Sequence, residues 1–229
     1  MRPAKPAQWS DPRDAGRLPN VYLAMGETAE NVAACKNVSR ARQDEVGARS
    51  QQNAQRATEA GFFCQDITPL ELRDGTVVSA DDGPRANVTA ESLAGLKPAF
   101  RPGGTVTAGN CCPLNDGAAA LVVMSDTRAA ELGITPLARI VSSVVSALSP
   151  EIMGLGPVEA SRRALANAGM SVADIDLWEI NEAFAAQVLP CVDELKIDLG
   201  KVNVHGGAIA LGHPFGQTGV RANRVVASA

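Results

Sequence analysis

The 229-residue sequence is poor in aromatic side chains, which make up only 3% of it. It contains no apolar run approaching the roughly 20 residues that cross a bilayer. The core must therefore be built mainly from Ala, Val, Leu and Ile, as is common in α/β proteins. The formal net charge is −4 and no basic stripe is present. These features argue against a nucleic-acid partner and against a membrane protein, but not against an anionic small-molecule ligand.

The five cysteines include no C-x-x-C pair, and no secretory hydrophobic segment follows Met1. This pattern predicts reduced thiols and a cytoplasmic protein. The adjacent Cys111 and Cys112 have no second Cys or His at ligand spacing, so we expect no metal site. Nothing near them indicates a helix N-terminus that would lower a thiol pKa.

The first half of the chain divides into three regions. Residues 1–20 contain four prolines and predict an extended or disordered lead-in. Residues 28–60 are rich in helix formers, and we expect two helices that separate near Asn37 and Ser39. Residues 62–110 are rich in Asp, Gly, Pro and Thr and predict an irregular region with small strands.

In the second half, apolar runs alternate with helical patterns. The runs predict buried strands at 118–125, 137–145, 175–180 and 202–211. The intervening patterns predict helices at 127–132, from Pro157 to just before Gly169, at 182–189 and from 219 onward. Pro190 would kink or end the helix at 182–189. Alternating strands and helices predict a layered α/β sheet.

His213 is the first candidate catalytic residue. It lies in A-L-G-H-P-F-G, where a predicted strand ends among glycines whose backbone can approach a ligand closely. A histidine in this position suits a general base or an oxyanion donor, although it can equally cap a turn. The other histidine, His205, falls within the predicted strand and is interpreted as structural.

Asn181 is the second candidate. It follows a predicted strand in W-E-I-N-E-A-F-A, and ligands gather beyond the carboxyl ends of strands in α/β sheets. It can hold a water or a carbonyl oxygen there. Taken alone, the residue is better explained as the N-cap of the helix that starts at Glu182.

Five motifs in order resemble the thiolase family of acetyl-CoA acyltransferases. They are M-G-E-T-A-E-N-V-A (25–33), R-S-Q-Q-N-A (49–54), G-T-V-T-A-G-N-C-C-P-L-N-D-G-A-A-A (104–120), E-I-N-E-A-F-A (179–185) and the G-G-A-I-A-L-G-H-P run ending at Pro214. The resemblance extends from about Val21 to the C-terminus. The chain departs from some members at Ala24, where they carry His.

The resemblance implies an α-β-α-β-α sandwich, here incomplete, with an irregular α+β loop domain that binds coenzyme A. After the lead-in at 1–20, residues 21–110 would form the loop domain. Residues 111–133 would end the N-terminal half, and residues 134–229 would form part of the C-terminal half.

The implied chemistry is thiolytic cleavage of a 3-ketoacyl-CoA to acetyl-CoA, or the reverse Claisen condensation, with coenzyme A as a substrate and no permanently bound cofactor. His213 matches the histidine that activates the nucleophilic cysteine and helps form an oxyanion hole. Asn181 matches the residue that positions a water in that hole. Met25 matches a residue that lines the acyl and pantetheine channel, and Cys112 matches a position, often Ser, that touches the pantetheine.

By the same resemblance, the nucleophilic cysteine and the C-x-G-x-G motif of the second catalytic cysteine are not among these residues. We therefore expect a fragment with low or no activity alone, since covalent acyl transfer needs an activated nucleophile. The family forms homo-oligomers, which we do not expect of this chain alone. The alternatives are a non-catalytic acyl-CoA-binding or interaction module derived from a thiolase, and a non-functional remnant.

Overall fold

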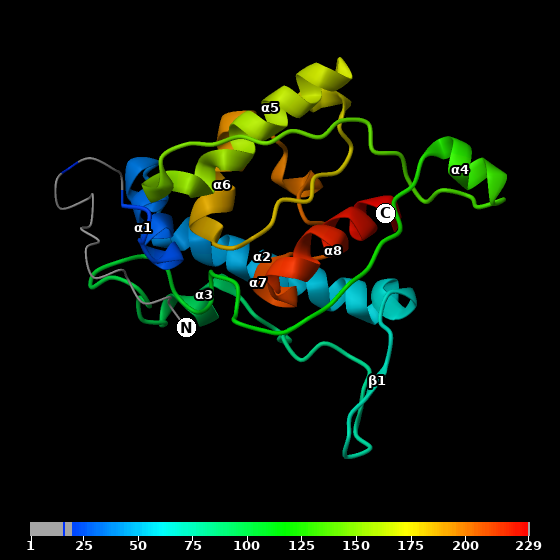
Figure 1. Cartoon of the computed structure of the whole chain (residues 1–229). Helices are drawn as coiled ribbons and strands as arrows, with labels where there is room; N and C mark the ends of the chain where they lie inside the picture. The colour runs from blue at the N-terminus through cyan, green and yellow to red at the C-terminus, as the bar shows by residue number, and fades with distance from the viewer. Residues whose placement is uncertain (1–15, 17–19, 229) are drawn as a thin grey trace, which may run out of the picture.

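The structure is a computed structural model that describes residue 16 and residues 20–228, so the predicted lead-in at 1–20 lies almost entirely outside the described residues. The regular secondary structure of the described part is mostly helical (Figure 1). The α-helices are α1 (Met25–Cys35), α2 (Arg40–Glu59), α3 (Ala90–Ala94), α4 (Asp126–Glu131), α5 (Gly156–Ala168), α6 (Ala185–Leu195), α7 (Ala208–Leu211) and α8 (Phe215–Ser228). The 3-10 helices are η1 (Phe62–Gln65), η2 (Pro150–Leu155), η3 (Val172–Asp174) and η4 (Leu199–Lys201). Among the described residues, no helix is both long enough and apolar enough to cross a membrane.

The predicted pair of helices in the first half is confirmed as α1 and α2. Asn37 has a positive φ of 53° between them, and the Ser39 hydroxyl accepts the Arg42 N–H at the start of α2. Gly61, with φ of 74°, follows the end of α2. Asn37, Ser39 and Gly61 therefore mark the ends of the two helices, as the preference of these residue types for turns and caps predicts.

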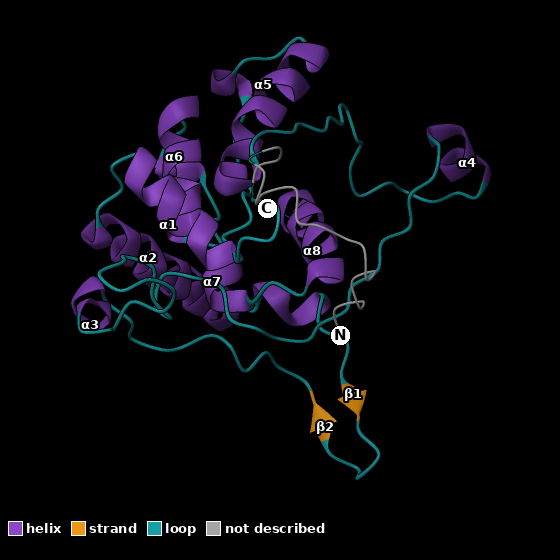
Figure 2. Ribbon diagram, turned by 60° about the vertical axis from the view of Figure 1, so that its left-hand side comes forward, coloured by secondary structure: helices purple, strands orange, loops and turns teal. Residues whose placement is uncertain are grey.

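Helix α6 is the centre of the packing. Ala185, Ala186 and Leu189 belong to a core cluster with α1 and α2, whereas Val188 and Val192 belong to a second cluster with Val158 of α5. Helix α2 packs against α6 and α7, and α1 and α5 also contact α6 (Figures 1 and 2). Two apolar faces on one helix thus join the N-terminal and C-terminal parts of the chain.

The irregular region predicted at 62–110 is confirmed. It contains one small antiparallel hairpin, in which Leu70 of β1 (Leu70–Glu71) lies opposite Val78 of β2 (Val77–Val78). The hairpin projects away from the helices in both views (Figures 1 and 2). The end of the region is anchored to α1, because the buried Glu30 carboxylate accepts the Thr105 and Val106 N–H groups, the closest contact of each being 2.9 Å.

The strands predicted at 118–125 and 137–145 are wrong for this structure. Neither segment pairs as a strand, and Val122 is 84% exposed where burial on both faces was expected. A strand needs backbone hydrogen bonds from a neighbouring strand, and no described segment supplies them. Burial still alternates between exposed and half-buried along 141–147, which is the period of an extended chain.

The strands predicted at 175–180 and 202–211 are also wrong. They are reduced to a single parallel bridge between Trp178 and Val202. Asn203 then takes a positive φ of 47°, which ends the extended path, and residues 208–211 form α7 instead.

The helices of the second half are closer to prediction. Helix α4 and the Gly169 end of α5 are confirmed, with α5 starting one residue before Pro157. The helix predicted at 182–189 instead spans Ala185–Leu195 and continues through Pro190. Burial around α6 offsets the roughly 3 kcal/mol that an interior proline costs.

Candidate functional site

His213 lies in the turn between α7 and α8. Its backbone N–H donates to the Asn115 side-chain oxygen at 3.0 Å, which ties the turn to the loop after Cys112. Gly212 has φ of 83°, and a Cβ there would fall 2.1 Å from the Asn115 amide. Only glycine allows this close approach, so the glycine before the histidine has a structural cause.

The imidazole of His213 is held in one tautomer by Thr218. Thr218 Oγ1 lies 2.7 Å from His213 Nδ1 and donates its own hydrogen to the Pro214 carbonyl at 3.1 Å. The hydroxyl therefore accepts from the ring, Nδ1 carries the proton, and Nε2 keeps its lone pair. Phe215 packs edge-on against the ring at 5.0 Å between centroids.

Asn181 faces that lone pair. Its amide Nδ2 lies 3.3 Å from His213 Nε2, at the long end for a hydrogen bond. Its carbonyl Oδ1 is buried and has no hydrogen-bond partner within the described part of the chain. The N-cap interpretation of Asn181 is wrong, because Phe184 occupies that position in α6. The structure thus brings together the two catalytic candidates, and one buried acceptor oxygen beside them has no partner among the described residues.

The side chain of Arg221 in α8 binds the backbone of the turn that carries His213. Its guanidinium donates to the carbonyls of Leu211 and Gly212, at 3.2 and 2.7 Å. Burial, together with the positive charge of Arg221, lowers the pKa of His213 and favours the neutral base. Burial and the nearby Glu182 raise the pKa of Glu179 to about 8, against the opposing charge of Arg221.

Cys112 lies close enough to Arg221 for the guanidinium charge to act on its thiol. Its backbone N–H donates to the Ala183 carbonyl at 3.0 Å, which pins the cysteine loop to the segment that carries Asn181. Burial raises the pKa of the Cys112 thiol, and burial raises that of Cys111 to about 11. Neither thiol is activated as a nucleophile. Among the described residues, no group of His, Cys, Asp and Glu has the arrangement of a metal site.

The other two residues singled out from the sequence lie elsewhere. Met25 is the first residue of α1 and is 48% exposed. His205 stacks on Phe62, with ring centroids 3.7 Å apart and planes 8° apart, which fits its interpretation as structural. The sequence reasoning missed Thr218 and Asn115, which bond His213, and Arg221, which binds the carbonyls of the two residues before it. The short spacing from His213 to Thr218 and Arg221 was the available signal.

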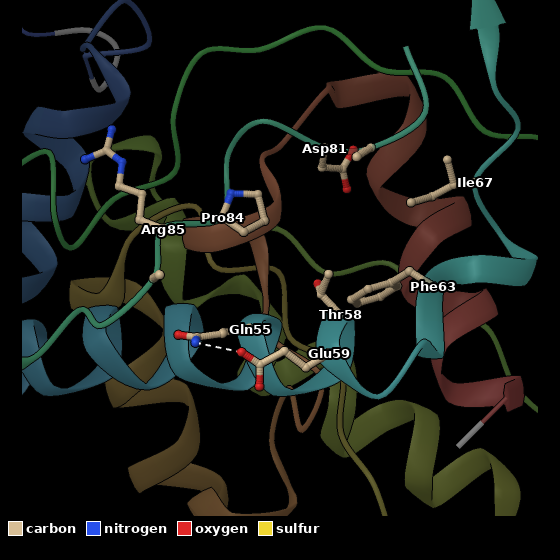
Figure 3. A pocket seen from close by; sticks show the side chains of 10 residues that line it. Gln55, Thr58, Glu59, Phe63, Ile67, Asp81, Pro84 and Arg85 are labelled. Carbon is tan, nitrogen blue, oxygen red and sulfur yellow. Dashed lines mark hydrogen bonds between the residues drawn. The ribbon is translucent and has the colours of Figure 1, made fainter. Parts of the chain in front are cut away.

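Two hollows flank the segment 80–86. The larger, with a volume of 320 Å³, lies between the C-terminal half of α2, η1 and this segment, and Phe63 and Ile67 face it (Figure 3). The smaller, of 130 Å³, includes Pro113, the neighbour of Cys112, and Ile209 of α7. Arg85 lines both hollows.

Comparisons with known proteins identify the family. The family model described as thiolase, N-terminal domain, matches residues 19–127, and the one described as thiolase, C-terminal domain, matches residues 134–229. The acetyl-CoA acetyltransferase of Escherichia coli (strain K12) is 52% identical over 86% of this chain and 51% of its own length. The 3-ketoacyl-CoA thiolase of Cronobacter sakazakii is 52% identical over 86% of this chain and 53% of its own length.

The solved structures that the chain resembles are also thiolases. The dimeric peroxisomal thiolase of Saccharomyces cerevisiae matches 91% of this chain and 53% of that chain, with a TM-score of 0.89 at 46% identity. Human mitochondrial 3-ketoacyl-CoA thiolase in complex with CoA matches 91% of this chain and 52% of that chain, with a TM-score of 0.87 at 43% identity. The chain belongs to the thiolase family and has a thiolase-like α/β fold. It spans about half the length of the curated relatives that it matches.

Proposed function

We propose that this chain supplies the base and oxyanion side of a thiolase-type acyltransferase that acts on 3-ketoacyl-CoA. The observation that carries the proposal is the pairing of the unprotonated His213 Nε2 with Asn181, whose free Oδ1 is buried beside it. An ordered base next to a free acceptor favours acyl transfer over non-catalytic binding.

In the proposed reaction, a cysteine thiolate attacks the ketone carbon of the 3-ketoacyl-CoA and the bond between the α and β carbons breaks. The electron pair leaves with acetyl-CoA, which takes up a proton. The acyl group then passes from the cysteine to the sulfur of a second CoA, whose thiol gives up a proton, so that no net proton is gained or lost. His213 Nε2 accepts the proton of the attacking thiol. Asn181 Oδ1 accepts a hydrogen from a water that in turn donates to the developing oxyanion.

Coenzyme A is proposed as a substrate that contacts residues 21–110, with Cys112 and Met25 along its pantetheine and acyl portion. The hollow beside Pro113 adjoins Cys112 and supports this path. Arg85 lines both hollows and carries a planar cation suited to a phosphate of the coenzyme. Residues 111–133 and 134–229 are proposed to belong to the N-terminal and C-terminal halves of the thiolase fold.

We further propose that the chain alone has low or no thiolase activity. Burial raises the pKa of Cys111 and of Cys191 to about 11 and also raises that of Cys112. None of these thiols is poised as the nucleophile. Two names among the relatives, 3-ketoacyl-CoA thiolase and acetyl-CoA acetyltransferase, support a place in fatty acid β-oxidation. The five free cysteines support a cytoplasmic site.

The test is a chimera in which residues 20–228 replace the matching segment of the Escherichia coli acetyl-CoA acetyltransferase. We expect the chimera to cleave acetoacetyl-CoA in the presence of CoA. A chimera that folds, as judged by circular dichroism, but is inert would overturn the proposal. The chain alone should produce no acetyl-CoA; turnover that is lost in Cys112→Ser would show that the nucleophile has been misassigned.

A further inference from the structure

Glu182 immediately follows Asn181 in the chain but turns into the protein interior, where its side chain is 3% exposed. Its carboxylate accepts three hydrogen bonds: from the Ser50 hydroxyl at 2.6 Å, the Asn203 amide at 2.7 Å and the Ile209 N–H at 3.2 Å. The donors come from α2, from the loop after η4 and from α7. One buried side chain thus joins three segments that are far apart in sequence.

The hydrogen-bond directions require Glu182 to be an acceptor. Ser50 Oγ accepts the Gly207 N–H at 3.1 Å, so its own hydrogen is directed to the Glu182 carboxylate. Burial raises the pKa of Glu182, whereas the bonds from Ser50, Asn203 and Ile209 oppose that rise. The nearby guanidinium of Arg221 also favours the charged form.

One branch of this network fixes the chain at Asn181. The side chain of Asn203 donates to the Ile180 carbonyl at 2.8 Å and accepts the Ile180 N–H at 2.9 Å. Both backbone polar groups of the residue before Asn181 are therefore held by the same amide that binds Glu182 on its other side.

The other branch fixes the chain that leads to His213. The Ile209 N–H and, through Ser50, the Gly207 N–H are bound to the carboxylate. A Cβ at Gly207 would lie 2.2 Å from the Glu182 carboxyl carbon, so the backbone approaches the acid as closely as glycine allows. Helix α7 ends at Leu211, so Gly212 and His213 follow it directly in the chain.

We infer that Glu182 is a positioning residue that sets the separation of Asn181 and His213 by binding the chain segments of both to helix α2. The inference rests on the proposed function, in which that separation places the base and the oxyanion ligand around one substrate carbon. A displacement of about 1 Å at such a site can cost about 10²-fold in rate.

The two histidines of the chain allow a direct test by NMR. Glu182→Gln keeps the size of the side chain but replaces one acceptor oxygen with an amide that faces donors. In the folded variant we expect the His213 ring and the Asn181 side-chain amide signals to shift, and the pKa of His213 to rise toward its ordinary value of 6.5 as the turn loosens. Glu131→Gln on the exposed α4 is the matched control and should leave these signals in place. If Glu182→Gln lowers only the melting temperature and His213 and Asn181 do not respond, the role is merely structural and the inference is overturned.

Ser50→Ala keeps the test decisive if Glu182→Gln does not fold, since it removes one donor and the link to Gly207 while leaving the carboxylate in place. The same signals should shift in the same direction by a smaller amount, and unchanged signals would contradict the inference.

In the chimera, Glu182→Gln should lower kcat about 10²-fold with little change in KM. Because the NMR readout needs no turnover, an inactive chimera with coupled NMR signals would refute the proposed function alone. If the chimera is active but its His213 NMR signals are unchanged by Glu182→Gln, the positioning role alone is refuted.

Discussion

The Asn181 amide nitrogen lies 3.3 Å from His213 Nε2 and donates to the lone pair of the neutral ring. A hydrogen bond to the neutral form disfavours protonation, so it acts in the same direction as the burial and the Arg221 charge that lower the pKa of His213. We therefore predict that Asn181→Ala raises this pKa, measured by NMR titration of the ring protons. An unchanged or lower value would show that the contact does not bind the lone pair.

The contact between Thr218 and His213 Nδ1 predicts a tautomer. Thr218→Val keeps the shape but removes the acceptor, and we expect the neutral ring to become a mixture of the Nδ1-H and Nε2-H forms. Nitrogen chemical shifts of the imidazole report this directly. In the chimera, kcat should fall about 10-fold, which corresponds to about 1.4 kcal/mol. Thr218→Ser retains the hydroxyl and should behave as the parent; a Ser variant that resembles Val would point to packing by the methyl group instead.

Glu179 predicts a pH dependence of stability. Its pKa is raised from 4.5 to about 8 in the folded chain, so between these values the folded state binds more protons than the unfolded state. Its contribution to the free energy of unfolding therefore falls as pH rises through this window, by at most about 1.4 kcal/mol per pH unit. Glu179→Gln should flatten this part of the profile, measured by urea unfolding at pH 5 and pH 8.5. If the variant and the parent lose stability in parallel, Glu179 is not the group responsible.

Arg85 predicts a CoA contact. Arg85→Ala removes a cation that lines both hollows, and we expect the Kd for CoA measured by calorimetry to rise about 10-fold or more, as for the loss of a charge-assisted hydrogen bond. Arg128→Ala on α4 is a control, since its partner Glu131 lies on the same exposed helix. Equal CoA affinity in the two variants would place the phosphates elsewhere.

Local chemistry in the sequence predicted the helices well. The break between α1 and α2 near Ser39 and the end of α5 at Gly169 were as expected, because helix ends depend mainly on neighbouring residues. Strands depend on partners distant in the chain. The apolar pattern at 118–125 describes a segment that needs neighbours on both sides, and within the described residues it has none. Propensity left open whether Pro190 kinks or ends its helix; α6 continues through it, because burial outweighs the lost hydrogen bond.

The site also divides into residues that local sequence patterns identify and residues whose role depends on distant contacts. His213 and Asn181 were recognisable from their motifs, and the structure places them within hydrogen-bond reach. The residues that hold them, Thr218 and Glu182, carry ordinary helix and loop signals in the sequence. Their importance arises from tertiary contacts, such as the Ser50–Glu182 bond across 132 positions of the chain.

The most direct test of the central claim is the rate of acetoacetyl-CoA thiolysis by the chimera with His213→Ala, compared with His205→Ala. If His213 is the base of this site, the first variant should lose at least about 10²–10³-fold in kcat. The second, which removes only the stack on Phe62, should keep kcat while its melting temperature falls. A folded His213→Ala chimera with the kcat of the parent would contradict the account.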